Sequence, residues 1–182
     1  YEINSKAKEN TKSNILKEKS KKIILARKYK PNIVARGLRT GKSTALGLIV
    51  EDIGNYFFGN VAKTIELAAY KKGYKVIFTS TDNDEAKAED LLQMLKHQQV
   101  DGFIITPTHG LKESIIQLKK KKKPFVLFDR YFPDVNTSYV VLDNFSGAYD
   151  MTNYLISKGY SKIAFVTIKS NMIQMTERLE GY

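Results

Sequence analysis

The sequence predicts an α/β protein in which an open parallel sheet carries helices on both faces. Short apolar runs rich in Val, Ile and Phe recur along the chain, and such nearly continuous runs are typical of strands covered on both sides. Most of these runs are separated by segments with helical spacing, which is the pattern of βαβ units with right-handed crossovers. With 182 residues, 42% of them hydrophobic, the chain is long enough for one substantial packed domain.

The predicted strands begin after Thr44. In chain order they are ALGLIV (45–50), KVIFTS (75–80), GFIITP (102–107), PFVLFD (124–129), YVVLD (139–143) and KIAFVTI (162–168).

The predicted helices lie between most of these strands. Apolar side chains from Phe58 to Ala69 follow a helical stripe, and Gly73 is placed to end that helix. Three further stripes predict helices; they are marked by Ala88, Leu91, Leu92 and Leu95, by Leu111, Ile115, Ile116 and Leu118, and by Ala148, Met151 and Leu155 with Gly159 as the stop.

The positive charge is concentrated at the start of the chain. The net charge is +11, and residues 1–43 hold 13 Lys or Arg against 3 Asp or Glu, whereas the remaining residues hold 17 against 16. A basic segment on a nearly neutral body is typical of polyanion binding. A basic arm that stays solvated without a specific partner explains the same charge equally well.

The stretch VARGLRTGKS (34–43) looks at first like a phosphate-binding P-loop. Three residues separate Gly37 from Gly41, whereas the motif needs four, and a P-loop follows a strand and opens a helix. Here KEKSKKIILARKYKPN (17–32) predicts a helix that ends before Pro31, and residues 32–41 predict a short helix between Asn32 and Gly41. The order is therefore reversed, which argues against a nucleotide-dependent enzyme.

Other function classes are disfavoured by what the residues lack. There is no Cys, and His97 and His109 are isolated, so neither a metal site nor a nucleophilic triad is indicated and we expect no enzyme and no cofactor. No apolar run approaches the roughly 18 residues of a membrane span, and no signal-peptide pattern opens the chain. These features favour a cytoplasmic protein with no membrane partner.

Several stretches together resemble the LacI/GalR family of bacterial transcription regulators. They are YKPNIVARGLRTGKS, GLIVEDIGNYFF, DGFIITPT, PFVLFDR, VVLDNFSGAYDMTNYLISKGYSKIAFVT and the closing ERLEGY, in the family's order, and the resemblance as a whole spans about residues 17–182. The resemblance implies that residues 1–43 are a remnant of a DNA-binding headpiece with its hinge helix. It also implies that residues 44–182 are the N-terminal, periplasmic-binding-protein-like subdomain of an effector domain, with the second subdomain missing.

The resemblance assigns the hinge to the DNA minor groove. Leu38 matches a leucine that wedges between base pairs, and packing of the linker onto the body is the alternative for this side chain. Arg36, Arg39 and Lys42 would contact phosphates beside it, and Asn32 and Ala35 match further hinge positions. The helix-turn-helix that reads bases in this family is not recognisable before Lys17.

An effector site is expected at the carboxyl ends of the strands, where open α/β sheets bind ligands. The resemblance makes Asp129 and Arg178 polar clamps for a sugar or related metabolite, with Phe57 and Phe58 as an apolar wall. Helical periodicity gives Phe58 an alternative place in the core, and Arg130 pairs with a carboxylate in the simplest interpretation. The remaining candidates are Asn55, Tyr56, Asp82 and Thr108.

The expected function is sequence-specific DNA binding that responds to a small molecule, in a homodimer whose partners are operator DNA and the effector. The alternative is a periplasmic-type sugar-binding protein of a transport system, which would need a secretion signal and no basic hinge. The run KKKKK (119–123) predicts a solvated helix end, with a second DNA contact as the alternative.

Overall fold

The computed structural model of the chain describes residues 16–19 and 42–182. The chain divides into two units, residues 1–41 and residues 42–182. In the first unit, Leu16 to Lys19 form an exposed helical turn. The proposed hinge residues Asn32, Ala35, Arg36, Leu38 and Arg39 lie outside the described residues, as does Gly37 to Gly41 of the stretch that resembles a P-loop.

Five parallel strands form one sheet, in agreement with the predicted fold class. The strands are β1 (Ala45–Val50), β2 (Lys75–Ser80), β3 (Gly102–Ile105), β4 (Phe125–Phe128) and β5 (Tyr139–Val140), in the order β2-β1-β3-β4-β5. At the centre, Leu48 of β1 is paired with Phe78 on one side and Ile104 on the other. All carboxyl ends of the strands therefore meet at one edge of the sheet.

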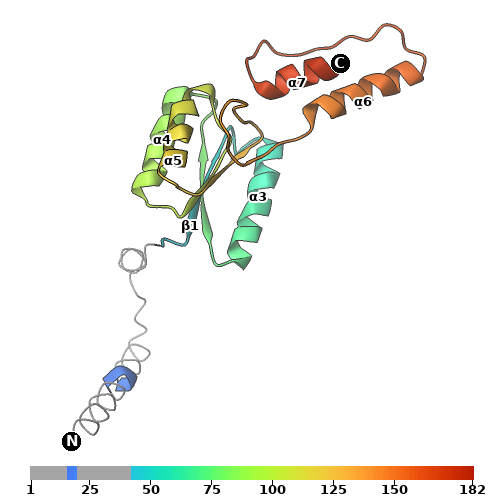
Figure 1. Ribbon diagram of the computed structural model, residues 1–182. Helices are drawn as coiled ribbons and strands as arrows, with labels where there is room; N and C mark the ends of the chain where they lie inside the picture. Colours follow the sequence, from blue (N-terminus) through green and yellow to red (C-terminus); the bar gives the residue numbers. More distant parts are fainter. Residues whose placement is uncertain (1–15, 20–41) are drawn as a thin grey trace, which may run out of the picture. The chain divides into compact units, whose positions relative to one another are not determined.

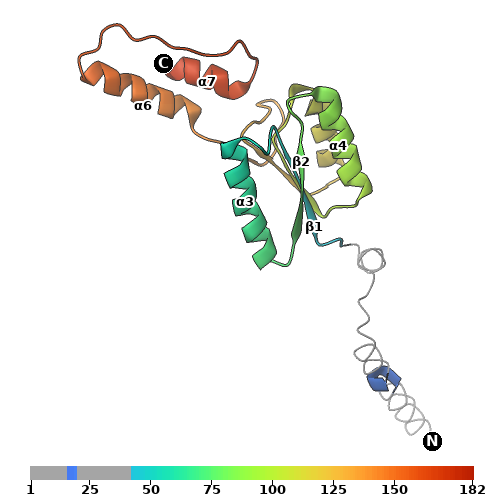
Figure 2. The same cartoon turned by 180° about the vertical axis from the view of Figure 1, so that it is seen from behind.

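Helices cover both faces of this sheet (Figure 1). The helix α3 (Tyr56–Lys71) packs on one face, and α4 (Glu85–His97) and α5 (Lys112–Lys120) pack on the other, with the short 3-10 helix η1 (His109–Leu111) leading into α5. Figure 2 shows the same layers from behind. Asn55 and Asp84 begin α3 and α4 by accepting hydrogen bonds from backbone N–H groups of the first turn.

The core has two parts because side chains alternate along a strand. Leu48 and Val50 point to the α3 face, where they pack with Phe58 and Ala62. Ile49 points to the opposite face, into a larger cluster that includes Leu92 and Leu95 of α4, Ile115 and Leu118 of α5, and Leu127 of β4. Phe58 is 6% exposed, so it occupies the core position that its helical spacing predicted.

After the sheet, α6 (Asn144–Ser157) and α7 (Ile173–Gly181) lie side by side in both views (Figures 1 and 2). They pack closely at Gly181, where an added Cβ would come 2.3 Å from the carbonyl oxygen of Phe145. Helix α6 was predicted, and α7 was not.

The strand predicted at 162–168 is wrong. That segment has no regular structure, and Val166 is 91% exposed. A strand needs a neighbour to pair its backbone N–H and C=O groups, and none lies beside this segment in the described part of the chain. For the same reason the strand predicted at 139–143 is shortened to Tyr139–Val140, at the edge of the sheet.

Candidate ligand-binding pocket

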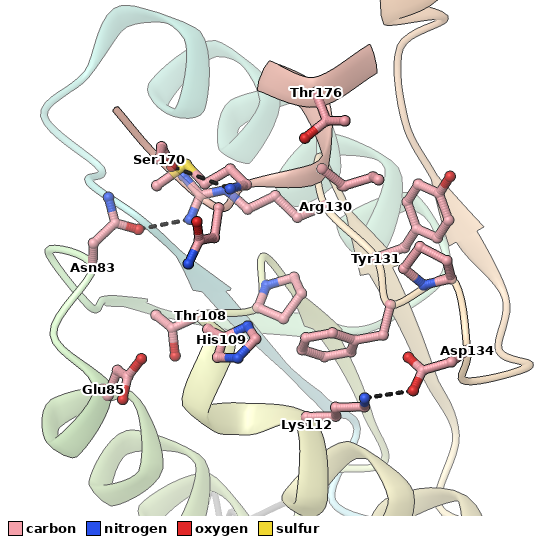
Figure 3. Close-up of a pocket in the computed structure, with 16 residues that line it drawn as sticks. Asn83, Glu85, Thr108, His109, Lys112, Arg130, Tyr131, Asp134, Ser170 and Thr176 are labelled. Carbon is pink, nitrogen blue, oxygen red and sulfur yellow. Dashed lines mark hydrogen bonds and ion pairs between the residues drawn. The ribbon is translucent and has the colours of Figure 1, made fainter. Parts of the chain in front are cut away.

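A pocket of about 370 Å³ opens at the carboxyl ends of the strands. Its walls come from the residues that follow β2, β3 and β4 and from the segment 170–176 at the start of α7 (Figure 3). Its size lies within the range of small-molecule sites. The lining residues are Asn83, Glu85, Pro107, Thr108, His109, Lys112, Arg130, Tyr131, Phe132, Pro133, Asp134, Ser170, Asn171, Met172, Ile173 and Thr176.

The backbone turns sharply where β2 and β4 end. Asp82, Asn83 and Asp129 have φ values of 54°, 58° and 66°. Asp and Asn adopt this left-handed region more readily than other non-glycine residues. Hydrogen bonds hold both turns against neighbouring strands, from Asp82 N to Glu51 O at 2.7 Å and from Asp129 N to Val140 O at 3.0 Å. The turns direct Asn83 and Arg130 toward the pocket (Figure 3).

Arg130 links the ends of three strands. Its guanidinium donates to the Glu51 carboxylate after β1 and to Asn83 Oδ1, at 2.6 Å, after β2. The pairing predicted for Arg130 is thus present, but it is buried, since the Arg130 side chain is 9% exposed and that of Glu51 is 30% exposed. The buried Nε of Arg130 has no hydrogen-bond acceptor among the described residues, and Asp129 Oδ2 lies 3.6 Å away.

Thr108 places an unsatisfied hydroxyl in the pocket wall. The residue is 4% exposed, and its Oγ1 has no hydrogen-bond partner among the described residues. The residue precedes η1 without capping it through its side chain. A buried polar atom without a partner is destabilising, so a ligand hydroxyl or carbonyl that reaches Thr108 would remove this cost.

Asp129 and Arg178 lie beside the pocket and are not among its lining residues. Burial raises the pKa of the Asp129 carboxyl above its ordinary value; the Arg130 charge opposes the rise, Glu51 adds to it, and Arg178 also opposes it. Arg178 acts on Asp129 although the two are far apart in the sequence. The structure therefore brings the two expected clamps into one electrostatic environment.

Arg178 belongs to a polar network that joins α6 and α7. Its Nε donates to Asn144 Oδ1 at 2.9 Å, and the Asn144 side-chain nitrogen donates to Glu177 Oε2 at 3.1 Å. Glu177 also accepts the hydroxyl of Tyr131, which lines the pocket, at 3.0 Å. The network connects the loop after β4 with both helices.

The structure does not bring the aromatic candidates into this pocket. Asn55 is the N-cap of α3 and accepts from Phe57 N at 2.9 Å, and Tyr56 is 87% exposed. The Phe57 ring stacks on Phe128 with centroids 5.9 Å apart, while Phe58 is in the core.

Asp82 also points away, since its carboxylate is paired with Lys87 on the surface. Of the effector candidates, Thr108 alone lines the pocket, and Asp82 is next to the lining residue Asn83.

Several pocket residues were not predicted as site residues. His109 lines the pocket, although its isolation in the sequence suggested no role, and Lys112 and Asp134 form an ion pair at the rim (Figure 3). Their positions after β3 and β4 could have identified them as candidate site residues, because loops at the carboxyl ends of parallel strands lie close together. The wall at 170–176 had no such signal, since it depends on where α7 packs.

The start of β1 differs from a phosphate-binding loop. The backbone N–H groups of Ser43 and Thr44 donate to the Asp101 carboxylate, at 2.7 Å and 3.0 Å, and Ala45 then begins β1. A carboxylate of the chain itself thus occupies N–H groups that a P-loop would offer to phosphate. Lys42, the remaining hinge candidate, is exposed directly before these residues.

Among residues 16–19 and 42–182, no helix combines the length and the apolar character that a membrane crossing requires.

Comparison with known proteins gives a consistent result. Residues 43–182 match the family described as periplasmic binding proteins and sugar binding domain of the LacI family. The chain is 35% identical over 153 residues to the HTH-type transcriptional regulator RegA of Clostridium saccharobutylicum, covering 83% of this chain and 46% of that protein. It is 37% identical over 167 residues to the sucrose operon repressor of Pediococcus pentosaceus, covering 91% and 50%.

A solved structure agrees with these relatives. The transcription regulator CcpA of Lactococcus lactis superimposes with a TM-score of 0.67 at 30% identity, covering 76% of this chain and 51% of that one. The chain thus spans about half the length of the relatives that it matches.

Proposed function

The chain belongs to the LacI family, and from this membership we propose that it is part of a DNA-binding transcriptional regulator whose affinity for operator DNA depends on a small-molecule effector. The relatives at 35% and 37% identity are named as a transcriptional regulator and an operon repressor. Because the chain spans about half of each relative, the regulatory activity of the whole protein is our inference. Neither relative's name is that of an enzyme.

The effector site in this proposal is the pocket at the strand ends. One observation carries it: Thr108 Oγ1 and Arg130 Nε are buried in residues that line the pocket and have no hydrogen-bond partner among the described residues. A polyhydroxylated ligand such as a sugar would supply oxygens to both, while Phe132 and Tyr131 offer apolar surface to its C–H groups. Asp129, which follows β4, and Arg178, which belongs to α7, would then hold further hydroxyls.

The DNA-binding part of the proposal rests on the first 43 residues. They carry +10 of the chain's net charge of +11, which suits contacts with phosphates. Leu38 would wedge between base pairs, with Arg36, Arg39 and Lys42 on the backbone and Asn32 and Ala35 close by.

We expect a homodimer in the cytoplasm that presents two such hinges to one operator. The ligand would contact both walls of the pocket, which are the loops after β2, β3 and β4 and the segment 170–176. It would thereby favour one arrangement of these two walls relative to each other.

A transport protein that binds sugar is the alternative use of this fold. It would use the same pocket and would have no need for a basic hinge. The strongly basic segment 1–43 and the names of the relatives both favour the regulator.

Ligand binding tests the pocket. A panel of sugars and purines is screened by thermal shift on the 182-residue chain, and the hit is measured by calorimetry on Thr108→Val and on the control Thr106→Val. Both threonines are buried with an unpaired hydroxyl, but Thr106 does not line the pocket. We expect the loss of one hydrogen bond, about a 3- to 10-fold weaker affinity, for Thr108→Val only. Equal affinities for both variants would contradict the assignment of the site.

DNA binding tests the regulator. Duplexes selected from a random pool are titrated with the chain, with and without the ligand hit. We expect Leu38→Ala to weaken binding, whereas Leu67→Ala, which removes a half-exposed leucine of α3, should leave it unchanged. Absence of DNA binding together with tight sugar binding would favour the transport alternative.

A further inference from the structure

The amino-terminal edge of the sheet collects lysines. The helices α3, α4 and α5 run back from the carboxyl ends of the strands, so each ends at the edge where the next strand begins. Lysines lie at all three of these helix ends, in the turns that follow α3 and α5, and at the first residue of β2. They are Lys71, Lys72, Lys75, Lys96 and the run 119–123, and all except Lys96 are classed as exposed. We call these nine residues the basic edge.

Carboxylates are placed mainly at the opposite edge. Glu51, Asp82, Asp129 and Asp134 all follow the carboxyl ends of strands, where the pocket lies. At the amino edge, Asp101 precedes β3, and its carboxylate already accepts the N–H groups of Ser43 and Thr44. The sheet unit is therefore electrically polarised, although residues 44–182 are almost neutral in sum.

Helix stability accounts for only part of this arrangement. Cations in the last turn of a helix favour its dipole, which explains Lys71, Lys96, Lys119 and Lys120. The next three lysines of the run lie beyond α5, and Lys122 has φ = 52°, a conformation that favours glycine. The corresponding position after α3 is indeed occupied by a glycine, Gly73, with φ = 80°. After α4 the same position is Gln99, with φ = 54°, so α3 alone of these three helices has glycine there.

The basic edge fits a row of phosphates. From β2 to β4 the sheet has three strand spacings, or about 14 Å, so lysines that precede these strands span a comparable length. Duplex DNA presents one charge per roughly 1.7 Å of its axis. The basic segment 1–43 also joins the sheet at this edge, because β1 begins at Ala45.

We propose that the basic edge is a second contact surface for the DNA backbone, which binds phosphates and adds affinity without reading sequence. The inference rests on the proposed DNA-binding function. It places the DNA at the edge opposite the ligand pocket, so both can be occupied together.

The test measures the salt dependence of DNA binding. The 182-residue chain and its variants are titrated into mixed-sequence duplex DNA over a series of KCl concentrations. The edge variant replaces Lys120, Lys121, Lys122 and Lys123 with Gln. Lys119 is retained because its Nζ donates to the Asn136 carbonyl. Gln is tolerated at position 122, since Gln99 already adopts the same backbone conformation, with φ = 54°.

The control variant removes the same charge elsewhere, by replacing Lys63, Lys158, Lys162 and Lys169 with Gln. Each phosphate contact contributes about 0.9 to the slope of log K against log [salt]. We expect the edge variant to lose about two to four units of slope and to bind roughly tenfold more weakly or worse, and the control to keep the parental slope within about one unit. Thermal unfolding of both variants verifies that they are folded.

Three outcomes would overturn the proposal. Equal slopes for the edge and control variants, with the parent bound to DNA, would reject the basic edge and leave the proposed function standing. No binding of DNA by the parent would reject both. If the parent binds vesicles of phosphatidylcholine and phosphatidylserine and the edge variant does not, while the two have the same salt slope for DNA, the basic edge would be assigned to a membrane surface.

Discussion

Replacing Arg130 with methionine should destabilise the fold far more than replacing any exposed lysine. The Arg130 side chain is 9% exposed, and its guanidinium donates to Glu51 and Asn83. Removing one partner of a buried ion pair costs about 3–5 kcal/mol, because the other charge is left without compensation. The Glu51 side chain is 30% exposed, so water recovers part of this cost. We therefore expect Arg130→Met to lower the free energy of unfolding by about 2–4 kcal/mol.

The assay is urea unfolding monitored by circular dichroism. The free energies of unfolding of parent and variant are compared, provided that the m-value is unchanged. Lys87→Met is the matched control. It also breaks an ion pair with a carboxylate, that of Asp82, but the Lys87 and Asp82 side chains are 44% and 60% exposed. Its expected effect is within about 0.5 kcal/mol of zero. A double-mutant cycle with Glu51→Gln should return a coupling of about 1–3 kcal/mol. If Arg130→Met costs no more than Lys87→Met, the buried pair does not hold the strand ends together.

Three further variants test separate parts of the structure. Asp129→Asn should raise the melting temperature at pH 7, because burial raises the pKa of Asp129; the advantage should shrink in a pH series as the pH falls through that raised value towards 3.8. Gly181→Ala should destabilise the packing of α6 and α7 by about 1–3 kcal/mol in urea unfolding, since the new Cβ would approach the Phe145 carbonyl oxygen; no loss would show that the helices separate freely. Lys122→Gly should stabilise the chain by about 0.5–1 kcal/mol in the same assay while weakening DNA binding, and a loss of stability would contradict the strain assigned to its positive φ.

The sheet was predictable because its signals are local. The runs 45–50 and 75–80 became β1 and β2 with the predicted bounds, since buried parallel strands need continuous apolar residues. Phe58 likewise took the core position that its spacing indicated. By contrast, the run 162–168 is also rich in Val, Ile and Phe and is not a strand. Such a run forms a strand only if another strand lies beside it and pairs with its backbone. The composition of the run does not indicate whether such a strand is present.

The candidate site was less predictable than the fold. The position of the pocket at the carboxyl ends of the strands followed from the predicted fold class. The individual predictions diverged: Thr108 lines the pocket, Asp129 and Arg178 share an electrostatic environment beside it, and Tyr56 and Phe57 lie elsewhere. Glu51 and Asn83 contribute to the site as hydrogen-bond acceptors for Arg130, which only the structure shows.

The amino-acid sequence by itself determined the alternation of strands and helices from β1 to α6, the edge of the sheet where the pocket lies, and the concentration of net positive charge before β1, because periodicity and charge can be read from neighbouring residues. Only the tertiary structure decided which side chains meet at that edge. The wall at 170–176, the pairing of Arg130 with Glu51 and the unsatisfied hydroxyl of Thr108 all arise from contacts between segments distant in the chain. Such contacts depend on how the elements pack, and no local pattern encodes them.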